Sequence, residues 1–375
     1  MRSTRPRAVR WVVPAACLAA IVALAVVPGT ISGWAASAPD LPELTPLELL
    51  TKVQSSRVDT LSGTVQLRND LGLPDLGGLG GGGGADAVTA LLAGTHEARI
   101  AISGADHVRI ALPDALAETN WILAGDDVWS WDSESQRVVH VSLAGAADDH
   151  PRRPDRPDAN PADLAQRLLD AVTPSTDVSV RAPRYVAGRA VYELALVPRS
   201  GASTVGEVAV AVDAETGLAL DVRITASGAA SPAFELGFTS VSFEAPPAST
   251  FEFTPPAGAT VVEAPDASAL ASPGTESYHR RHHTDATAAA DAAPEPEPTV
   301  DVVGAAWDCV AVVSGASLPP EIAKLFGTAP RVEAGNIGGR LVSTKLVNAV
   351  LLDDGRIVIG AVGPDALLAA VTPAA

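Results

Sequence analysis

Apolar and polar residues alternate in short runs along most of the chain between residues 60 and 243. Such a period of two puts apolar side chains on one face of a strand and polar side chains on the other. The runs lie at residues 63–68, 96–102, 107–112, 120–123, 128–131, 137–141, 178–181, 190–196, 207–212, 219–224, 234–238 and 240–243. About eleven short strands and few helices predict a mainly β (α+β) fold with one large antiparallel sheet, whose apolar face must be covered.

Two helices and one tight turn complete this pattern. Apolar residues recur at helical spacing over residues 44–58, and Pro46 suits a first helical position. Asn160 and Pro161 are typical of the start of a second helix, which the apolar spacing extends to Val172. Residues 213–217 end in a glycine and predict a hairpin turn.

Two inserts interrupt the strands. Residues 71–92 contain a glycine run from Gly80 to Gly84, which lacks the Lys-Ser/Thr of a phosphate-binding loop. We interpret this insert as a mobile flap. Residues 148–160 are rich in Pro, Arg and Asp and predict a solvated loop.

The composition changes after Val262. Residues 264–300 are almost entirely Ala, Pro, Ser, Thr, Asp and Glu, which is typical of an extended, disordered linker. The histidines of residues 279–283 lie in this linker beside two arginines, so we interpret them as a solvated basic spot and not a metal site. Residues 301–375 predict a small β-α-β-β-α unit with its strands at residues 306–313, 341–352 and 356–362 and a tight turn at residues 353–355.

The N-terminus predicts export. Four arginines within the first ten residues precede an uncharged apolar stretch that ends in small residues at positions 35–38. This is the layout of a secretory signal, and residues 11–38 are also long enough to anchor the chain in a membrane if they are not cleaved. The predicted organisation is therefore a signal or anchor (1–38), a β-rich domain (39–263), a linker (264–300) and a C-terminal domain (301–375), with the body of the protein outside the cytoplasm.

Charge and cysteine content narrow the function. The formal net charge is −18, which argues against a nucleic-acid partner. Only two cysteines occur, Cys17 in the N-terminal stretch and Cys309, so an intrachain disulfide framework is excluded from the exported part.

The sequence contains none of the common catalytic motifs. It has no nucleophile elbow, no His-Glu-x-x-His, no Cys-x-x-Cys and no dinucleotide-binding glycine pattern. The strand histidines His96, His107 and His140 are expected to face solvent, and Cys309 is expected to be a small buried apolar residue. We therefore expect no enzyme, no metal and no cofactor, but a protein that binds something apolar.

Several motifs resemble the LolA superfamily, which includes the lipoprotein carrier LolA, the sigma-factor regulator RseB (MucB) and mycobacterial lipid carriers. Residues 125–132 (GDDVWSWD) resemble the family's D-G-x-x-x-W-x-Y-D strand, with Trp131 in place of the tyrosine. Residues 212–222 resemble its D-x-x-T-G-L-P turn, and residues 251–262 (FEFTPPAGATVV) its F-x-F-x-P-P-x-G-x-x-V ending. The resemblance covers roughly residues 40–263 and leaves out the C-terminal domain.

The resemblance implies an unclosed antiparallel β-barrel wrapped around helices, with an apolar cavity that holds acyl chains. Each buried methylene contributes about 0.8 kcal/mol to such binding. Trp129 and Trp131 share one face of their strand, and only one of Trp121 and Ile122 can join it. These tryptophans either close the core or line the cavity. The candidate cavity residues are Trp121, Trp129, Trp131, Leu91, Leu92, Phe234 and Phe238, with Leu91 and Leu92 in a possible lid.

Three functions fit this outline. The first is a LolA-like carrier of lipid or lipoprotein acyl chains in the cell envelope. The second is an RseB/MucB-like regulator that binds a membrane-anchored anti-sigma factor. The third is an accessory subunit of an envelope transporter.

Overall fold

The computed structural model describes residues 38–73, 94–113, 117–143, 160–264, 298–318, 320–334 and 337–372. The predicted signal, most of the glycine-rich flap with Leu91 and Leu92, the loop at 148–159 and most of the linker lie outside these described residues. Within them, no helix has both the length and the apolarity needed to cross a membrane.

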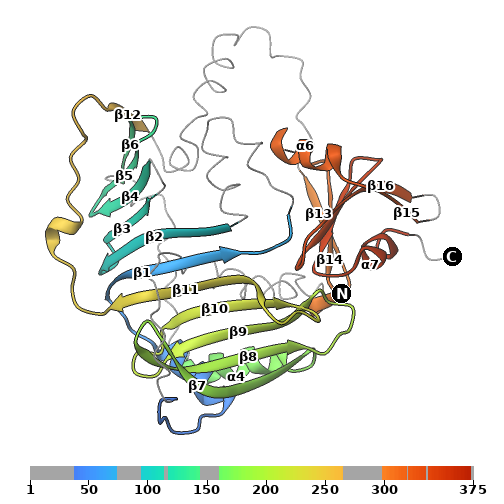
Figure 1. Ribbon diagram of the computed structural model, residues 1–375, viewed down its shortest axis with the longest axis horizontal. Helices are drawn as coiled ribbons and strands as arrows, with labels where there is room; N and C mark the ends of the chain where they lie inside the picture. The colour runs from blue at the N-terminus through green and yellow to red at the C-terminus, as the bar shows by residue number, and fades with distance from the viewer. Residues whose placement is uncertain are drawn as a thin grey trace, which may run out of the picture.

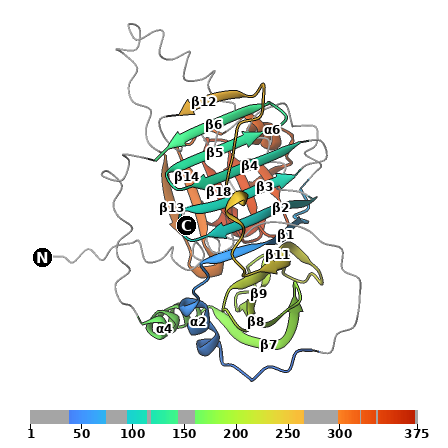
Figure 2. The same ribbon diagram turned by 90° about the vertical axis from the view of Figure 1, so that its left-hand side faces the viewer.

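A twelve-stranded sheet, here called the large sheet, forms the main body (Figures 1 and 2). Its strands, in chain order, are β1 (Thr60–Asn69), β2 (Gly94–Ser103), β3 (His107–Pro113), β4 (Glu118–Ala124), β5 (Asp127–Asp132), β6 (Arg137–Ser142), β7 (Thr176–Val186), β8 (Arg189–Pro198), β9 (Val205–Asp213), β10 (Ala219–Ala226), β11 (Pro232–Ser242) and β12 (Thr260–Ala264). The spatial order is β12-β6-β5-β4-β3-β2-β1-β11-β10-β9-β8-β7. Since β12 and β7 stand at opposite edges, the sheet is not closed into a barrel.

The predicted strands are confirmed, except that the runs at residues 234–238 and 240–243 form the single strand β11, and one strand, β12, is additional. Every neighbouring pair is antiparallel except β12, which pairs in parallel with β6. Strand β12 is missed by the sequence pattern because it has no hairpin partner: the chain crosses the sheet over residues 243–259 before it pairs. The turn between β9 and β10 is as expected, with Gly217 at a φ of 75°.

Two helices pack at the β7–β8 end of the large sheet. Helix α2 (Pro46–Ser55) begins with a capping box in which Thr45 and Glu48 bond reciprocally, and Asn160 caps α4 (Pro161–Val172). The two helices contact each other, and Leu49 of α2 is fully buried against Tyr192, Leu194 and Val212. Both predicted helices are confirmed.

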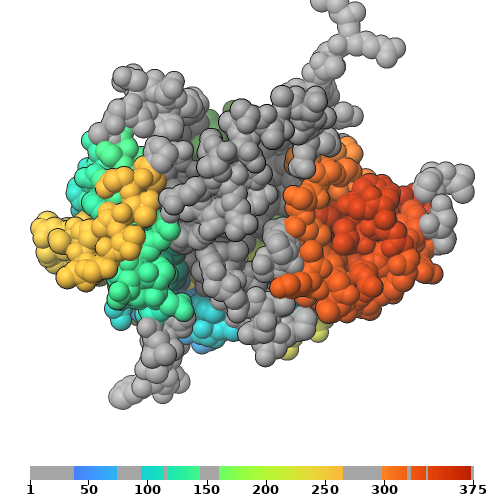
Figure 3. Space-filling view, turned by 90° about the horizontal axis from the view of Figure 1, so that it is seen from above, coloured from blue at the N-terminus to red at the C-terminus, as the bar shows by residue number. Residues whose placement is uncertain are grey.

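The C-terminal region, residues 298–372, carries a second sheet of six strands. They are β13 (Thr299–Val303), β14 (Val310–Ser314), β15 (Arg331–Ala334), β16 (Ile337–Ser343), β17 (Asn348–Leu352) and β18 (Ile357–Gly360), in the order β13-β14-β18-β17-β16-β15. Helices α6 (Pro320–Thr328) and α7 (Pro364–Ala369) accompany it. Figure 3 shows this region at the opposite side of the molecule from β5 and β6.

The prediction of a β-α-β-β-α unit is wrong in strand number. Strand β13 begins inside the predicted linker, β15 is missed, and the expected strand over residues 341–352 is two strands, β16 and β17, joined at residues 344–347. The turn at residues 353–355 is confirmed, with Gly355 at a φ of 85°.

Candidate functional site

The register of the large sheet sorts its side chains onto two faces, since directly paired residues point the same way. We call one the apolar face. It carries the following residues, one from each strand in spatial order from β7 to β6: Val180, Leu194, Val210, Val222, Leu236, Val65, Ile100, Ile110, Trp121, Val128 and Val139.

The opposite face, here called the polar face, carries a polar or charged side chain on each of these strands. One member from each strand, in the same order, is Arg181, Glu193, Glu207, Arg223, Glu235, Arg68, Arg99, Arg109, Asn120, Asp127 and His140. In contrast, the described strands from β3 to β5 carry a single charged side chain on the apolar face, Asp132 at the end of β5. The apolar face can therefore hold a hydrocarbon without leaving a charge unsolvated.

Two groups of described residues cover parts of the apolar face. Helix α2 covers the β7–β9 end through Leu49. From the C-terminal region, Trp307 and Leu346 pack against the core that contains Val208, Leu236 and Phe238. The apolar face is therefore partly used as an ordinary core.

The C-terminal region is bonded to the large sheet at this place. The indole Nε1 of Trp307 donates to Thr176 Oγ1 at 2.8 Å, and the amide of Thr204 donates to Ala361 O at 2.9 Å. The amide of Lys345 donates to Leu71 O at 2.8 Å, and its ammonium lies 2.7 Å from Asp70 Oδ2. Sequence reasoning missed this contact, although an isolated Trp in a small unit was a signal for it.

Strands β3, β4 and β5 present a half-buried stretch of the apolar face. Val65 and Leu236 nearer the centre are 1% and 4% exposed. In contrast, Ile110, Trp121 and Val128 are only half-buried. This half-buried stretch, with Val108 and Leu123 beside it, is the candidate site.

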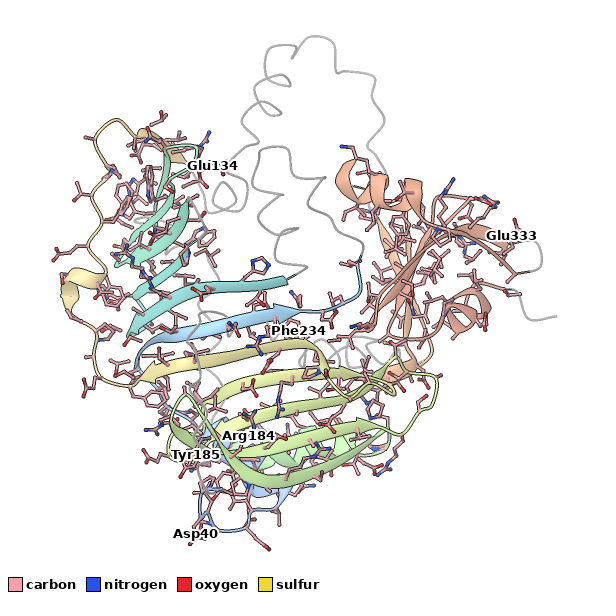
Figure 4. All side chains as sticks on the ribbon, viewed as in Figure 1. Asp40, Glu134, Arg184, Tyr185, Phe234 and Glu333 are labelled. Atoms are coloured by element: carbon pink, nitrogen blue, oxygen red, sulfur yellow. The ribbon has the colours of Figure 1, made fainter. Side chains whose placement is uncertain are left out.

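The structure divides the residues that the sequence placed in one cavity. Trp121, Phe234 and Phe238 lie on the apolar face, and Figure 4 shows Phe234 near the middle of the large sheet. Trp129 and Trp131 lie on the polar face, where they pair with Ile122 and Asn120. Ile122, and not Trp121, therefore shares their face.

The chain segment before β12 covers the polar face near these tryptophans. Trp129 stacks on His140 at 3.9 Å between ring centroids and lies 5.6 Å from Phe253. Phe251, which is 3% exposed, meets His107 edge-on at 5.5 Å. Trp129 is thus part of a structural contact that fixes the crossing segment.

His140 is tied at both ring nitrogens. Its Nδ1 lies 2.6 Å from Glu263 of β12 and its Nε2 lies 2.9 Å from Asp127 of β5. Burial opposes the charged ring, but the bonds to Asp127 and Glu263 outweigh it and raise the pKa of His140. The expectation that His140 faces solvent is wrong: its side chain is 15% exposed because it joins the two strands that flank β6.

The β7 edge carries a cluster of buried charges on the polar face. Arg184 of β7 binds Glu193 of β8 at 2.7 Å and also Asp221 of β10, which Arg223 contacts as well. Because β7 and β10 are three strands apart and neighbouring strands lie about 4.8 Å apart, the sheet must curl here to bring the two side chains together. Burial raises the pKa of Asp221 despite both arginines. These ion pairs stabilise the curl of the sheet, and Figure 4 shows Arg184 at this end of it.

The described side chains that could act as metal ligands, nucleophile or base do not form a common site. No group of three or more His, Cys, Asp or Glu side chains that could hold a metal occurs among the described residues. Cys309 is half-buried and burial raises the pKa of its thiol, which makes it a poor nucleophile. His107 is bound to Asp106 at 3.0 Å on the sheet surface.

Comparison with known proteins finds similarity only at the level of structure. No protein-family model matches the sequence, and no curated protein matches it significantly. The MucA/MucB complex of Pseudomonas aeruginosa is 16% identical, with 87% of this chain and 95% of that chain covered and a TM-score of 0.39. A LolA superfamily protein of Nitrosomonas europaea is 13% identical, with 56% and 99% covered and a TM-score of 0.22.

A third solved structure is a putative outer membrane lipoprotein-sorting protein domain from Vibrio parahaemolyticus. It is 12% identical, with 52% of this chain and 91% of that chain covered and a TM-score of 0.20. The fold itself is defined by the sheet order and register above.

Proposed function

We propose that this protein is an exported binding protein of the cell envelope that holds the acyl chains of a lipid or lipoprotein against the apolar face of its large sheet. The observation that supports it most is the half-buried apolar stretch of β3, β4 and β5. Its side chains are aliphatic or aromatic and offer hydrocarbon contact over three adjacent strands.

Trp121 is the residue on which this proposal depends most. It pairs with Ile110 on β3 and Ser130 on β5, so it stands in the middle of the half-buried stretch. A large flat ring at this position offers more contact area to an acyl chain than any neighbouring side chain.

Native mass spectrometry of the exported chain tests the proposal. We expect protein purified from the envelope to carry extra mass that disappears on denaturation and that lipid extraction identifies as an acyl lipid. A clean protein mass, unchanged after incubation with envelope lipids, would contradict acyl-chain carriage.

A second candidate function is the binding of a protein partner, as in an RseB/MucB-like regulator or a transporter accessory subunit. Strand β13 favours it, because β13 is an edge strand of the small sheet and every residue in it is exposed, including Val300 at 56%. Such an edge can pair with a strand of another chain. This function predicts a stoichiometric protein complex free of lipid, which the same mass measurement distinguishes from a lipid-loaded carrier.

A further inference from the structure

A hollow of about 620 Å³ lies on the polar face, on the opposite side of the large sheet from the proposed acyl-chain site. Strands β1, β2, β3 and β11 form its floor, and Thr250 of the crossing segment forms part of its wall. Figure 2 looks onto this side, where the yellow segment before β12 passes in front of the sheet. The hollow uses none of the residues assigned to the acyl-chain site.

Two arginines line the hollow from adjacent strands. Arg99 of β2 pairs with Ala111, and Arg109 of β3 pairs with Ala101, so the two are diagonal neighbours on one face. Two like charges placed in this way repel each other unless an anion lies between them.

Neither guanidinium meets a carboxylate within the described residues. Arg109 donates to Asn120 Oδ1 at 3.2 and 3.1 Å and to Thr250 O at 3.1 Å, both neutral acceptors. Arg99 is exposed and makes no hydrogen bond or ion pair to the described part of the chain. Hence neither guanidinium forms a direct ion pair with a carboxylate of the described residues.

This contrasts with the other arginines on the polar face. Arg68 is 3.1 Å from Glu235, and Arg181 and Arg184 bind Glu207 and Glu193. In a chain with 44 acidic and 26 basic residues, a carboxylate partner is readily supplied. A pair of arginines without one therefore marks a place for an external anion.

The rest of the lining adds neutral hydrogen-bond donors. Ser62, Thr64, Ser240 and Ser242 place hydroxyl groups around the hollow. Glu118 also lines it, but its carboxylate accepts from Asn120 Nδ2 at 2.8 Å. Several hydroxyls and two guanidiniums offer more donors than the two oxygens of a carboxylate require, and they match the three oxygens of a phosphate group.

We propose that this hollow binds the phosphate group of a small phosphate ester, with Arg99 as the principal ligand and Arg109 as the second charge. The hollow exceeds the size of a phosphate ion, so it has room for the attached group. The net charge of −18 disfavours approach to an anionic bilayer, which points to a soluble ester and not a lipid headgroup within a membrane.

Titration of the full exported chain with inorganic phosphate and with glycerol 3-phosphate, at constant ionic strength in chloride, tests the proposal. Isothermal calorimetry and the melting temperature give the affinity. We expect both probes to bind and Arg99→Gln to weaken binding about tenfold or more. Arg99→Lys keeps the charge but loses the forked geometry of the guanidinium. Its affinity for the two probes should therefore lie between that of the wild type and that of Arg99→Gln.

Arg57→Gln is the matched control, because Arg57 is also exposed and only contacts the adjacent Ser56 carbonyl oxygen. Sedimentation with phosphatidylglycerol vesicles separates the two sources of phosphate. Arg99-dependent sedimentation would overturn the soluble ester in favour of a membrane headgroup. Binding that is equal in Arg99→Gln and the wild type, or that chloride reproduces, would overturn the site itself.

Discussion

Residues at the two ends of the apolar face differ in how far they are buried. At the β7–β9 end, Leu49 of α2 is fully buried against Tyr192 and Leu194, as in an ordinary core. At the β3–β5 end, Ile110 and Trp121 have the same apolar character but are only half-buried. The same alternating sequence pattern thus serves stability at one end and, in our account, ligand binding at the other.

The largest effect is expected from a cavity at the covered end. Leu49→Ala should lower the free energy of unfolding by about 2–5 kcal/mol, because the helix cannot collapse onto the space that the side chain leaves. Val108→Ala, at the half-buried end, should cost about 1 kcal/mol or less. Chemical denaturation of both variants checks this, and equal losses would contradict the division of the face.

A smaller effect is expected at the contact between the C-terminal region and the apolar face. Trp307→Phe keeps an aromatic ring but removes the donor to Thr176, which is 1% exposed. Leaving this hydroxyl without the indole should cost about 0.5–1.5 kcal/mol. Hydrogen exchange should show faster exchange in β18 and at residues 203–205, and unchanged protection there would argue that the contact is not maintained in solution.

The smallest effect is a pH dependence at the β12 edge. The raised pKa of His140 means that its ion pairs with Asp127 and Glu263 stabilise the fold fully below the unfolded pKa of about 6.5. This contribution, of a few tenths to about 1 kcal/mol, should be lost as the pH rises through the folded pKa.

The difference in stability between the wild type and His140→Gln, measured by denaturation from pH 5 to pH 9, isolates this contribution. The difference should shrink as the pH rises. A difference that stays constant across this range would show that the charge of His140 contributes nothing to holding β12.

Alternation of period two was sufficient to predict the antiparallel strands and the existence of one apolar face. It also placed Trp129 and Trp131 on one face, but it could not decide whether Trp121 or Ile122 joins them, since that depends on the register between β4 and β5. The crossing segment with Phe251 and Phe253 decides which face is structural, and its path is set by contacts far apart in the sequence.

The alternation pattern also fails to predict all the strands of the C-terminal region. Strand β15 has only four residues, and β16 contains Gly338 and Gly339 and gives little alternation, so neither strand stands out in the sequence pattern. The sequence also could not predict that Arg99 and Arg109 lack an ion pair with a described carboxylate. That depends on which acidic side chains come close to them in the folded chain.

The central claim is that β3, β4 and β5 bind acyl chains on the apolar face. Trp121→Ala and Trp129→Ala form a matched pair for testing it, because both tryptophans are half-buried and lie on adjacent strands but on opposite faces. The decisive measurement is the affinity of each variant for a fluorescent fatty acid, beside its melting temperature. We predict that Trp121→Ala weakens binding about tenfold or more, as loss of a large aromatic contact implies, while Trp129→Ala retains it. Equal affinity in the two variants and the wild type would contradict the account.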